Sequence, residues 1–182
     1  ERDSPVVITD VMVTSGAAAE PENPGASVEF TGTFGDATYD VDTSTYTFPS
    51  TAQPWAGFAN EDTTVYPFTF PEGGSITFMA SAAVPTSVKF KFEKNPFPDT
   101  EPSFETATVL IDSTTAQEYT VEFATQGENT FSSFLLYLIE RDSPVVITDV
   151  MVTSGAAAEP EPEPENPGAS VEFTGTFGDA TY

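Results

Sequence analysis

The stretch VKFKFEK, residues 88–94, alternates apolar and charged side chains. Successive side chains of a β-strand point to opposite faces, so this alternation predicts one face in a core and one open face. The inward set is Val88, Phe90 and Phe92, and the outward set is Lys89, Lys91 and Glu93. The stretch therefore predicts a strand whose outer face carries charge.

The same period of two recurs along most of the chain. The other segments expected to be strands are SVEFTGTF (27–34), ATYDV (37–41), STYTF (44–48), SITFMASA (75–82), ATVLI (107–111), EYTVEF (118–123), FSSFLLYLIE (131–140) and SPVVITDVMV (143–152). Turns containing Gly, Pro, Asp and Asn separate them, and no segment keeps a helical period. We predict an all-β fold, an antiparallel β-sandwich of jelly-roll type. Its expected core includes Phe30, Phe78, Phe90, Phe92, Val121, Phe123, Phe134, Leu136 and Val150.

One segment departs from the alternation. FLLYLIE, residues 134–140, is apolar on both faces. A strand of this kind is typical of the middle of a sheet that is covered on both sides. We therefore expect a central strand sandwiched between layers.

The chain contains a long internal repeat. Residues 1–22 are identical to residues 140–161, and residues 23–39 are identical to residues 166–182. Large repeats predict a tandem array of modules joined by linkers, and alternating Glu and Pro makes an extended linker. We expect a preceding repeat's last strand at 1–15, linkers at 16–25 and 156–168, one complete module at 26–155, and a following repeat's first strands at 169–182.

The repeated ends also predict association between copies of the chain. Strands that lack their own sheet pair with other chains through unpaired backbone groups. The apolar residues expected to take part in this strand exchange are Val6, Val7, Ile8, Val11, Val13, Val171 and Phe173.

Composition excludes several function classes. With 29 acidic and 5 basic residues the chain carries a net charge of −24, which argues against nucleic-acid partners and membrane insertion. It has no His and no Cys, so disulfides, common zinc sites and His-based catalysis are excluded. We predict a protein that is not an enzyme, that needs no cofactor and that acts outside the cell or at its surface.

Calcium is the one cation that the sequence leaves open. DVDTSTY, residues 40–46, places Asp40 and Asp42 at alternate positions, as in the start of a calcium loop. The stretch lacks the Gly and the distal Glu of an EF-hand loop, and Asp and Ser are also common in turns. Asp40 and Asp42 are therefore weak candidates for a metal site.

The segment QPWAGFANEDTTVYPFTFPEGG, residues 53–74, is the best candidate for a binding site. It mixes aromatic and polar residues that suit sugar recognition, since rings stack on sugar faces while polar atoms bind hydroxyl groups. The candidate residues are Trp55, Phe58, Asn60 and Tyr66, joined by Lys89 and Lys91. In the alternative reading, Trp55 plugs one end of the core and the lysines neutralise acidic neighbours across the sheet.

Three long motifs carry a resemblance to a known group of proteins: residues 45–82, 88–109 and 129–152. They resemble the noncatalytic β-sandwich modules appended to secreted polysaccharide-degrading enzymes of marine bacteria, such as β-glucanases and agarases. The resemblance implies a jelly-roll fold and binding of a glucan or galactan.

Two functions are therefore expected. The duplication favours a repeated structural module of a long extracellular fibre or adhesin. The alternative is a carbohydrate-binding module that brings a secreted enzyme or a cell to a polysaccharide.

Overall fold

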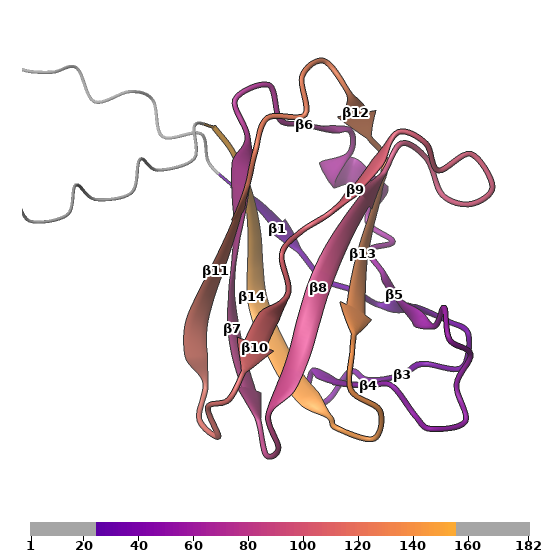
Figure 1. Ribbon diagram of the computed structural model, residues 1–182, viewed down its shortest axis with the longest axis vertical. Coiled ribbons are helices and arrows are strands. Elements are labelled where there is room, and N and C mark those ends of the chain that lie inside the picture. The colour runs from indigo at the N-terminus through magenta and orange to yellow at the C-terminus, as the bar shows by residue number, and fades with distance from the viewer. Residues whose placement is uncertain (1–24, 156–182) are drawn as a thin grey trace, which may run out of the picture.

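Strand β8 (Thr86–Glu93) contains all but the last residue of the alternating stretch 88–94. Its inward residues Val88, Phe90 and Phe92 are fully buried. The computed structural model describes residues 25–155. Around β8 lies a six-stranded antiparallel sheet, named here the β8 sheet (Figure 1). Its strand order is β10 (Val109–Ile111), β8, β13 (Ser133–Leu138), β5 (Gly57–Ala59) and β2 (Gly32–Phe34), and β9 (Ser103–Glu105) pairs with β8.

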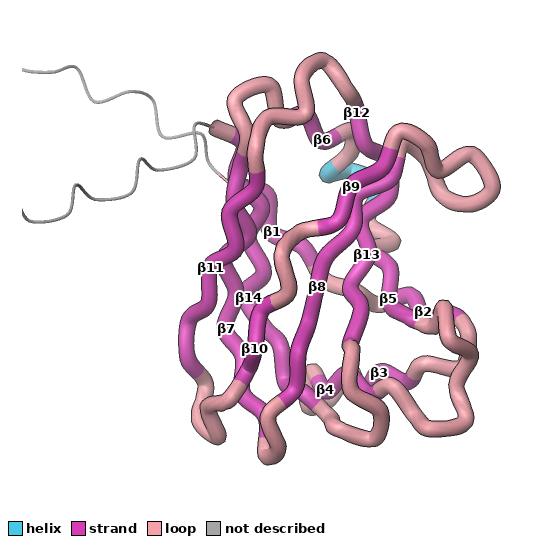
Figure 2. Tube along the Cα trace, in the orientation of Figure 1, coloured by secondary structure: helices cyan, strands magenta, loops and turns pink. Residues whose placement is uncertain are grey.

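A second six-stranded antiparallel sheet, the β14 sheet, packs against the first. Its strand order is β11 (Gln117–Phe123), β7 (Gly74–Ala82), β14 (Val145–Ser154), β4 (Thr45–Thr47) and β3 (Thr38–Asp40). Strand β1 (Ala26–Val28) also pairs with β14. The short pair β6 (Phe68–Thr69) and β12 (Thr130–Phe131) and the 3₁₀ helix η1 (Thr63–Val65) complete the described part of the chain (Figure 2). The predicted all-β antiparallel sandwich is thus confirmed.

The core between the two sheets is rich in phenylalanine. The ring of Phe92 on β8 stacks on that of Phe134 on β13, with centroids 4.1 Å apart, because these residues are paired across the two strands. Phe78 of β7 meets Phe90 edge to face at 5.3 Å and so joins the opposite sheet to this cluster. All nine residues predicted for the core are buried.

The predicted strand SVEFTGTF is wrong in one respect, because it is not a single strand. Its first part is β1, which pairs with β14, and its second part is β2, which pairs with β5 in the other sheet. Val28 and Phe30 are both buried, so the chain crosses from one sheet to the other at the edge of the core. Alternation alone does not show such a crossing, since both halves keep an inward face.

The interpretation of FLLYLIE is only half right. Strand β13 is central in the β8 sheet, with β8 on one side and β5 on the other. Its outer face, however, is not covered by another layer: Leu135 and Tyr137 line a groove there. The apolar outer face of β13 is therefore the floor of a surface depression.

The described residues leave some of the sequence-based predictions untested. No helix among residues 25–155 is long and apolar enough to cross a membrane. Residues 1–24 and 156–182 lie outside the described residues, and with them the predicted flanking repeats, most of the linkers and the predicted strand-exchange residues. The assignment of these segments stays a prediction.

Candidate functional site

A groove of about 1000 Å³ lies on the outer face of the β8 sheet. Its floor comes from β2, β5, β8 and β13, and its rims come from the loop before β5, the segment around η1 and the loop between β8 and β9. In Figures 1 and 2 the loop between β8 and β9 projects at the upper right. The lining residues are Phe34, Trp55, Ala59, Asn60, Glu61, Thr63, Tyr66, Lys91, Glu93, Pro96, Phe97, Thr100, Ser132, Ser133, Leu135 and Tyr137.

The floor is aromatic at one end because Gly57 has no side chain. The rings of Phe34 and Tyr137 meet edge to face with centroids 5.9 Å apart. A Cβ atom at Gly57 would lie 2.8 Å from both Phe34 Cζ and Tyr137 Cε1. Glycine therefore lets these two rings come together above β5.

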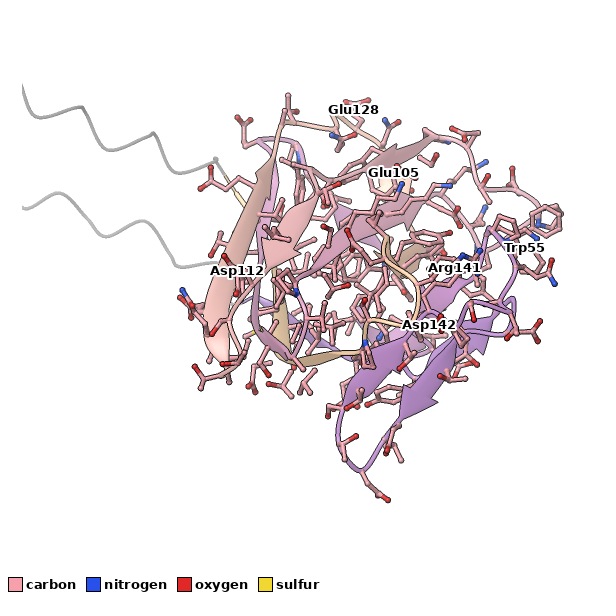
Figure 3. The ribbon with its side chains drawn as sticks, turned by 60° about the horizontal axis from the view of Figure 1, so that its bottom comes forward. Trp55, Glu105, Asp112, Glu128, Arg141 and Asp142 are labelled. Atoms are coloured by element: carbon pink, nitrogen blue, oxygen red, sulfur yellow. The ribbon has the colours of Figure 1, made fainter. Side chains whose placement is uncertain are left out.

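Trp55 stands beside this floor. Its ring lies nearly parallel to that of Phe34, at 6° and 6.3 Å between centroids, and the residue is 61 % exposed. Figure 3 shows Trp55 at the periphery of the molecule. The alternative in which Trp55 plugs the core is therefore wrong, and one face of the indole is open to a ligand.

The loop that carries Trp55 is fixed at several points. Gln53 N donates to Gly35 O at 2.8 Å, and Gly35 adopts a left-handed φ of 65° in the turn after β2. Arg141 lies over the ring of Phe48 at 4.0 Å and donates from Nη1 to the carbonyl oxygens of Pro49, Ser50 and Ala52. These contacts hold residues 48–53, the part of the loop that comes directly before Trp55.

The polar part of the floor lies on β8 and β13. Lys91 Nζ is 2.8 Å from Glu93 Oε1, and Ser133 donates to Glu93 Oε2 at 3.3 Å. Lys89 instead pairs with Glu105 on β9 at 2.6 Å. The alternative in which the lysines neutralise acidic neighbours across the sheet holds for Lys89, whereas Lys91 pairs with Glu93 of its own strand. Lys91 lines the groove, and Lys89 is absent from the lining.

Tyr66 ties the segment around η1 to β13. Its hydroxyl donates to Asn60 O at 3.3 Å and accepts from Phe134 N at 3.1 Å. The Asn60 side chain donates from Nδ2 to Glu29 O at 2.8 Å, while its buried Oδ1 has no protein partner among the described residues. Both residues line the groove, but their contacts show that they also hold the rim in place.

The predicted role of Phe58 in sugar contact is wrong. Phe58 is 1 % exposed and packs edge to face on Tyr46 at 5.0 Å, inside the core. Neighbouring strand residues point to opposite faces, so Gly57 and Ala59 face the groove side and Phe58 the core. The aromatic residues of segment 53–74 therefore do not form one patch, because alternation along β5 divides them between two faces.

Phe97 is the main groove residue that the sequence reasoning missed. It is 89 % exposed and lies between Pro96 and Pro98 in the loop after β8. That loop is closed by hydrogen bonds from Lys94 N to Thr100 O and from Asn95 Nδ2 to Asp99 Oδ2. An aromatic residue between two prolines does not fit a core strand, and this was the available clue to an exposed ring.

The weak metal candidates lie at the end of β3 and just beyond it: Asp40 is the last residue of β3, and Asp42 lies in the turn that follows. Asp40 Oδ1 accepts a hydrogen bond from Asp42 N at 3.0 Å, as in an Asx turn. Within residues 25–155 no group of three or more acidic side chains is arranged to hold a metal ion. The turn explains both residues, and calcium binding stays an untested expectation.

Three tyrosines are held in their neutral form. Burial, helped by the negative charges of Glu93 and Glu105, raises the pKa of Tyr137 to about 12. Burial likewise raises the pKa of Tyr66 to about 12 and raises that of Tyr46 further. Each of these tyrosines has a higher pKa in the folded chain than in the unfolded chain, where it is about 10. The fold therefore keeps its full stability below pH 10 and loses stability as the pH rises toward 12.

We therefore expect the melting temperature to be level up to about pH 10 and to fall steeply between pH 10 and 12. Phenolate absorbance should rise in the same range, together with unfolding. In Tyr137→Phe the fall should be shallower, because one group that must ionise is gone. A melting temperature that stays level to pH 12 would contradict the burial of these hydroxyl groups.

Comparison with known proteins places the fold. No family model and no curated protein sequence matches the chain. Among solved structures, the CBM22-1 xylan-binding domain from Paenibacillus barcinonensis Xyn10C is similar, with a TM-score of 0.52 and 19 % identity over 78 % of this chain and 100 % of that domain. A family 29 carbohydrate-binding module from Piromyces equi gives a TM-score of 0.45 and 14 % identity over 74 % of this chain and 88 % of its own. The first likeness shows a β-sandwich fold of the kind found in carbohydrate-binding modules.

Proposed function

We propose that residues 25–155 bind a polysaccharide in the groove of the β8 sheet and do not act on it chemically. The observation that carries the proposal is the pair of exposed rings, Trp55 and Phe97, on the rims of an open groove of about 1000 Å³. Single exposed apolar residues are normal on a protein surface, but exposed rings gathered around a groove with a polar rim are typical of a binding site. The groove is also large enough for several sugar residues.

The polar lining suits sugar hydroxyl groups. Glu61, Asn60, Thr63 and Ser132 offer donors and acceptors along the rim and floor. Glu93 is already engaged by Lys91 and Ser133, so it orients the floor instead of acting as an acid or base. We therefore favour binding over hydrolysis.

Charge points to a neutral polysaccharide. Each basic residue in the described range has a partner: Lys89 with Glu105, Lys91 with Glu93, Lys94 with Asp99, and Arg141 with loop carbonyls. The whole chain carries a net charge of −24, which repels anionic polymers. Neutral chains such as glucans, xylans, mannans or galactans meet no such barrier.

This role fits a protein outside the cell or at its surface, where polysaccharides are met. The other predicted role, a structural module of a fibre or adhesin, has no support in the fold or in the groove. The resemblance carried by residues 45–82, 88–109 and 129–152 suggests instead that the module is attached to a polysaccharide-degrading enzyme.

Affinity gel electrophoresis tests the proposal. We expect the protein to be retarded in gels that contain at least one neutral polysaccharide and to run unhindered with alginate or carrageenan. Trp55→Ala serves as the matched variant in the same gels. Unhindered migration with every neutral polysaccharide, or retardation by the anionic ones alone, would overturn the proposal.

A further inference from the structure

A second depression, named here the side pocket, lies beside the groove. It has a volume of about 370 Å³ and is lined by Ser27, Val28, Glu29, Thr31, Asn60 and Asp62. Asn60 lines the groove as well, and of the two residues that follow it Glu61 lines the groove and Asp62 lines the side pocket. Segment 60–62 is therefore a ridge between the two depressions.

The ridge is narrow, so one ligand can occupy both depressions. Residues two apart along a chain lie no more than about 7 Å from each other. A sugar unit attached to a chain in the groove can therefore reach across the ridge. The volume of the side pocket lies near the lower end of the range for small-ligand sites, and it suits one or two sugar units.

Hydrogen bonds hold the ridge in place on both sides. Asn60 N donates to Phe134 O of β13 at 3.0 Å, and Asn60 Nδ2 donates to Glu29 O at 2.8 Å. Asp62 Oδ1 accepts from Thr64 N at 2.8 Å and from Thr64 Oγ1 at 2.7 Å. The side pocket is thus formed before any ligand binds.

The side pocket differs chemically from the groove. It has no aromatic lining residue, and its one apolar residue, Val28, is only 3 % exposed. The side pocket therefore cannot stack on a sugar ring as Trp55 can. Within residues 25–155 the carboxylate of Glu29 and Oδ2 of Asp62 have no hydrogen-bond partner, so both are free to accept from a ligand.

Asn60 adds a third acceptor without a partner. The residue is 8 % exposed, and its buried Oδ1 accepts no hydrogen bond from the described residues, although buried polar atoms normally have a partner. The hydrogen bonds from Thr64 lower the pKa of the Asp62 carboxyl, so this group is an ionised acceptor at neutral pH. A pocket whose free groups are acceptors suits a ligand rich in donors, such as the hydroxyl groups of a sugar.

We propose that the protein recognises a branched neutral polysaccharide, with the main chain in the groove and a side branch of one or two sugar units in the side pocket. This inference rests on the proposed function, since it assigns the main chain to the groove. The branch adds hydrogen bonds at the side pocket and leaves the contacts of the main chain unchanged. A linear chain binds through the groove alone.

The test compares linear and singly branched oligosaccharides that share a main chain, for glucan, xylan, mannan and galactan main chains. Calorimetric titration of the full chain measures each affinity. We expect the branched member of at least one pair to bind about tenfold more tightly than the linear member, which is the effect of one or two added hydrogen bonds. Glu29→Ala removes a carboxylate from the side pocket and Ser27→Tyr fills it. Either variant should bring the two affinities together and leave binding of the linear member unchanged.

Glu122→Ala is the matched control, because Glu122 is exposed on β11 and lines neither depression. It removes the same charge as Glu29→Ala and should keep the difference between the two members of the pair. EDTA should also leave the difference unchanged, whereas its loss in EDTA would show a cation in the side pocket and contradict direct contact with the sugar.

The proposal is overturned if no branched member binds more tightly than its linear partner, or if the difference survives both Glu29→Ala and Ser27→Tyr. Failure of every linear and branched member to bind would contradict polysaccharide binding in the groove itself, and this inference with it.

Discussion

Phe92→Ala is expected to lower the free energy of unfolding by about 3–5 kcal/mol, the range for removing a buried phenylalanine. Phe92 is fully buried and lies at the centre of the aromatic core. Its ring contacts Phe134 at 4.1 Å and Phe70 and Phe104 at 5.0 Å each. The substitution leaves a cavity that these rigid rings cannot fill, and urea denaturation measures the loss.

Phe97→Ala is the matched control in the same part of the chain. Phe97 is 89 % exposed, so its removal should change the free energy of unfolding by no more than about 0.5 kcal/mol. Polysaccharide binding should weaken, however, because the ring lines the groove. Equal losses of stability for the two variants would contradict the division between core and groove that the structure shows.

Trp55→Ala is expected to weaken polysaccharide binding by about 30-fold, which corresponds to about 2 kcal/mol. The indole is the largest exposed ring of the groove, and its support by Phe34 at 6.3 Å keeps one face free for a sugar ring. Stability should fall by less than about 1 kcal/mol, because few core contacts are lost. Depletion of the protein from solution by an insoluble neutral polysaccharide measures the effect.

Two variants control this experiment. Trp55→Phe keeps a flat ring and should retain part of the affinity. Val84→Ala removes an exposed apolar side chain that is 59 % accessible and absent from the groove lining, and binding should be unchanged. If Trp55→Ala binds as well as the parent, the polysaccharide site lies elsewhere; if it unfolds, the tryptophan has a structural role.

The alternation of apolar residues was sufficient to predict the fold class and the core. In β8 and β7 every second residue is buried, so the strands and their inward faces follow directly from the sequence. The short strands β5, β6 and β9 were not predicted, because two or three residues carry no periodic pattern. The crossing from β1 to β2 was missed for a related reason, since it depends on which strands pair at long range.

The site could be predicted only in part. Trp55 was found because it is the one tryptophan in a segment of mixed polarity, and Phe58 was wrongly added because its inward orientation depends on β5. Leu135 and Tyr137 were seen as an apolar face, but only the structure shows that this face is open. Phe97 comes from a loop distant in the sequence, and no local pattern connects it with Trp55.

The fluorescence of Trp55 during titration with neutral polysaccharides tests the central claim most directly. Trp55 is the single tryptophan of the chain and lines the groove, so its emission reports on that site alone. The account predicts a saturable shift of the emission to shorter wavelength with at least one soluble glucan, xylan, mannan or galactan, as the exposed indole becomes covered. Emission that stays constant at saturating concentrations of all four would contradict polysaccharide binding in the groove.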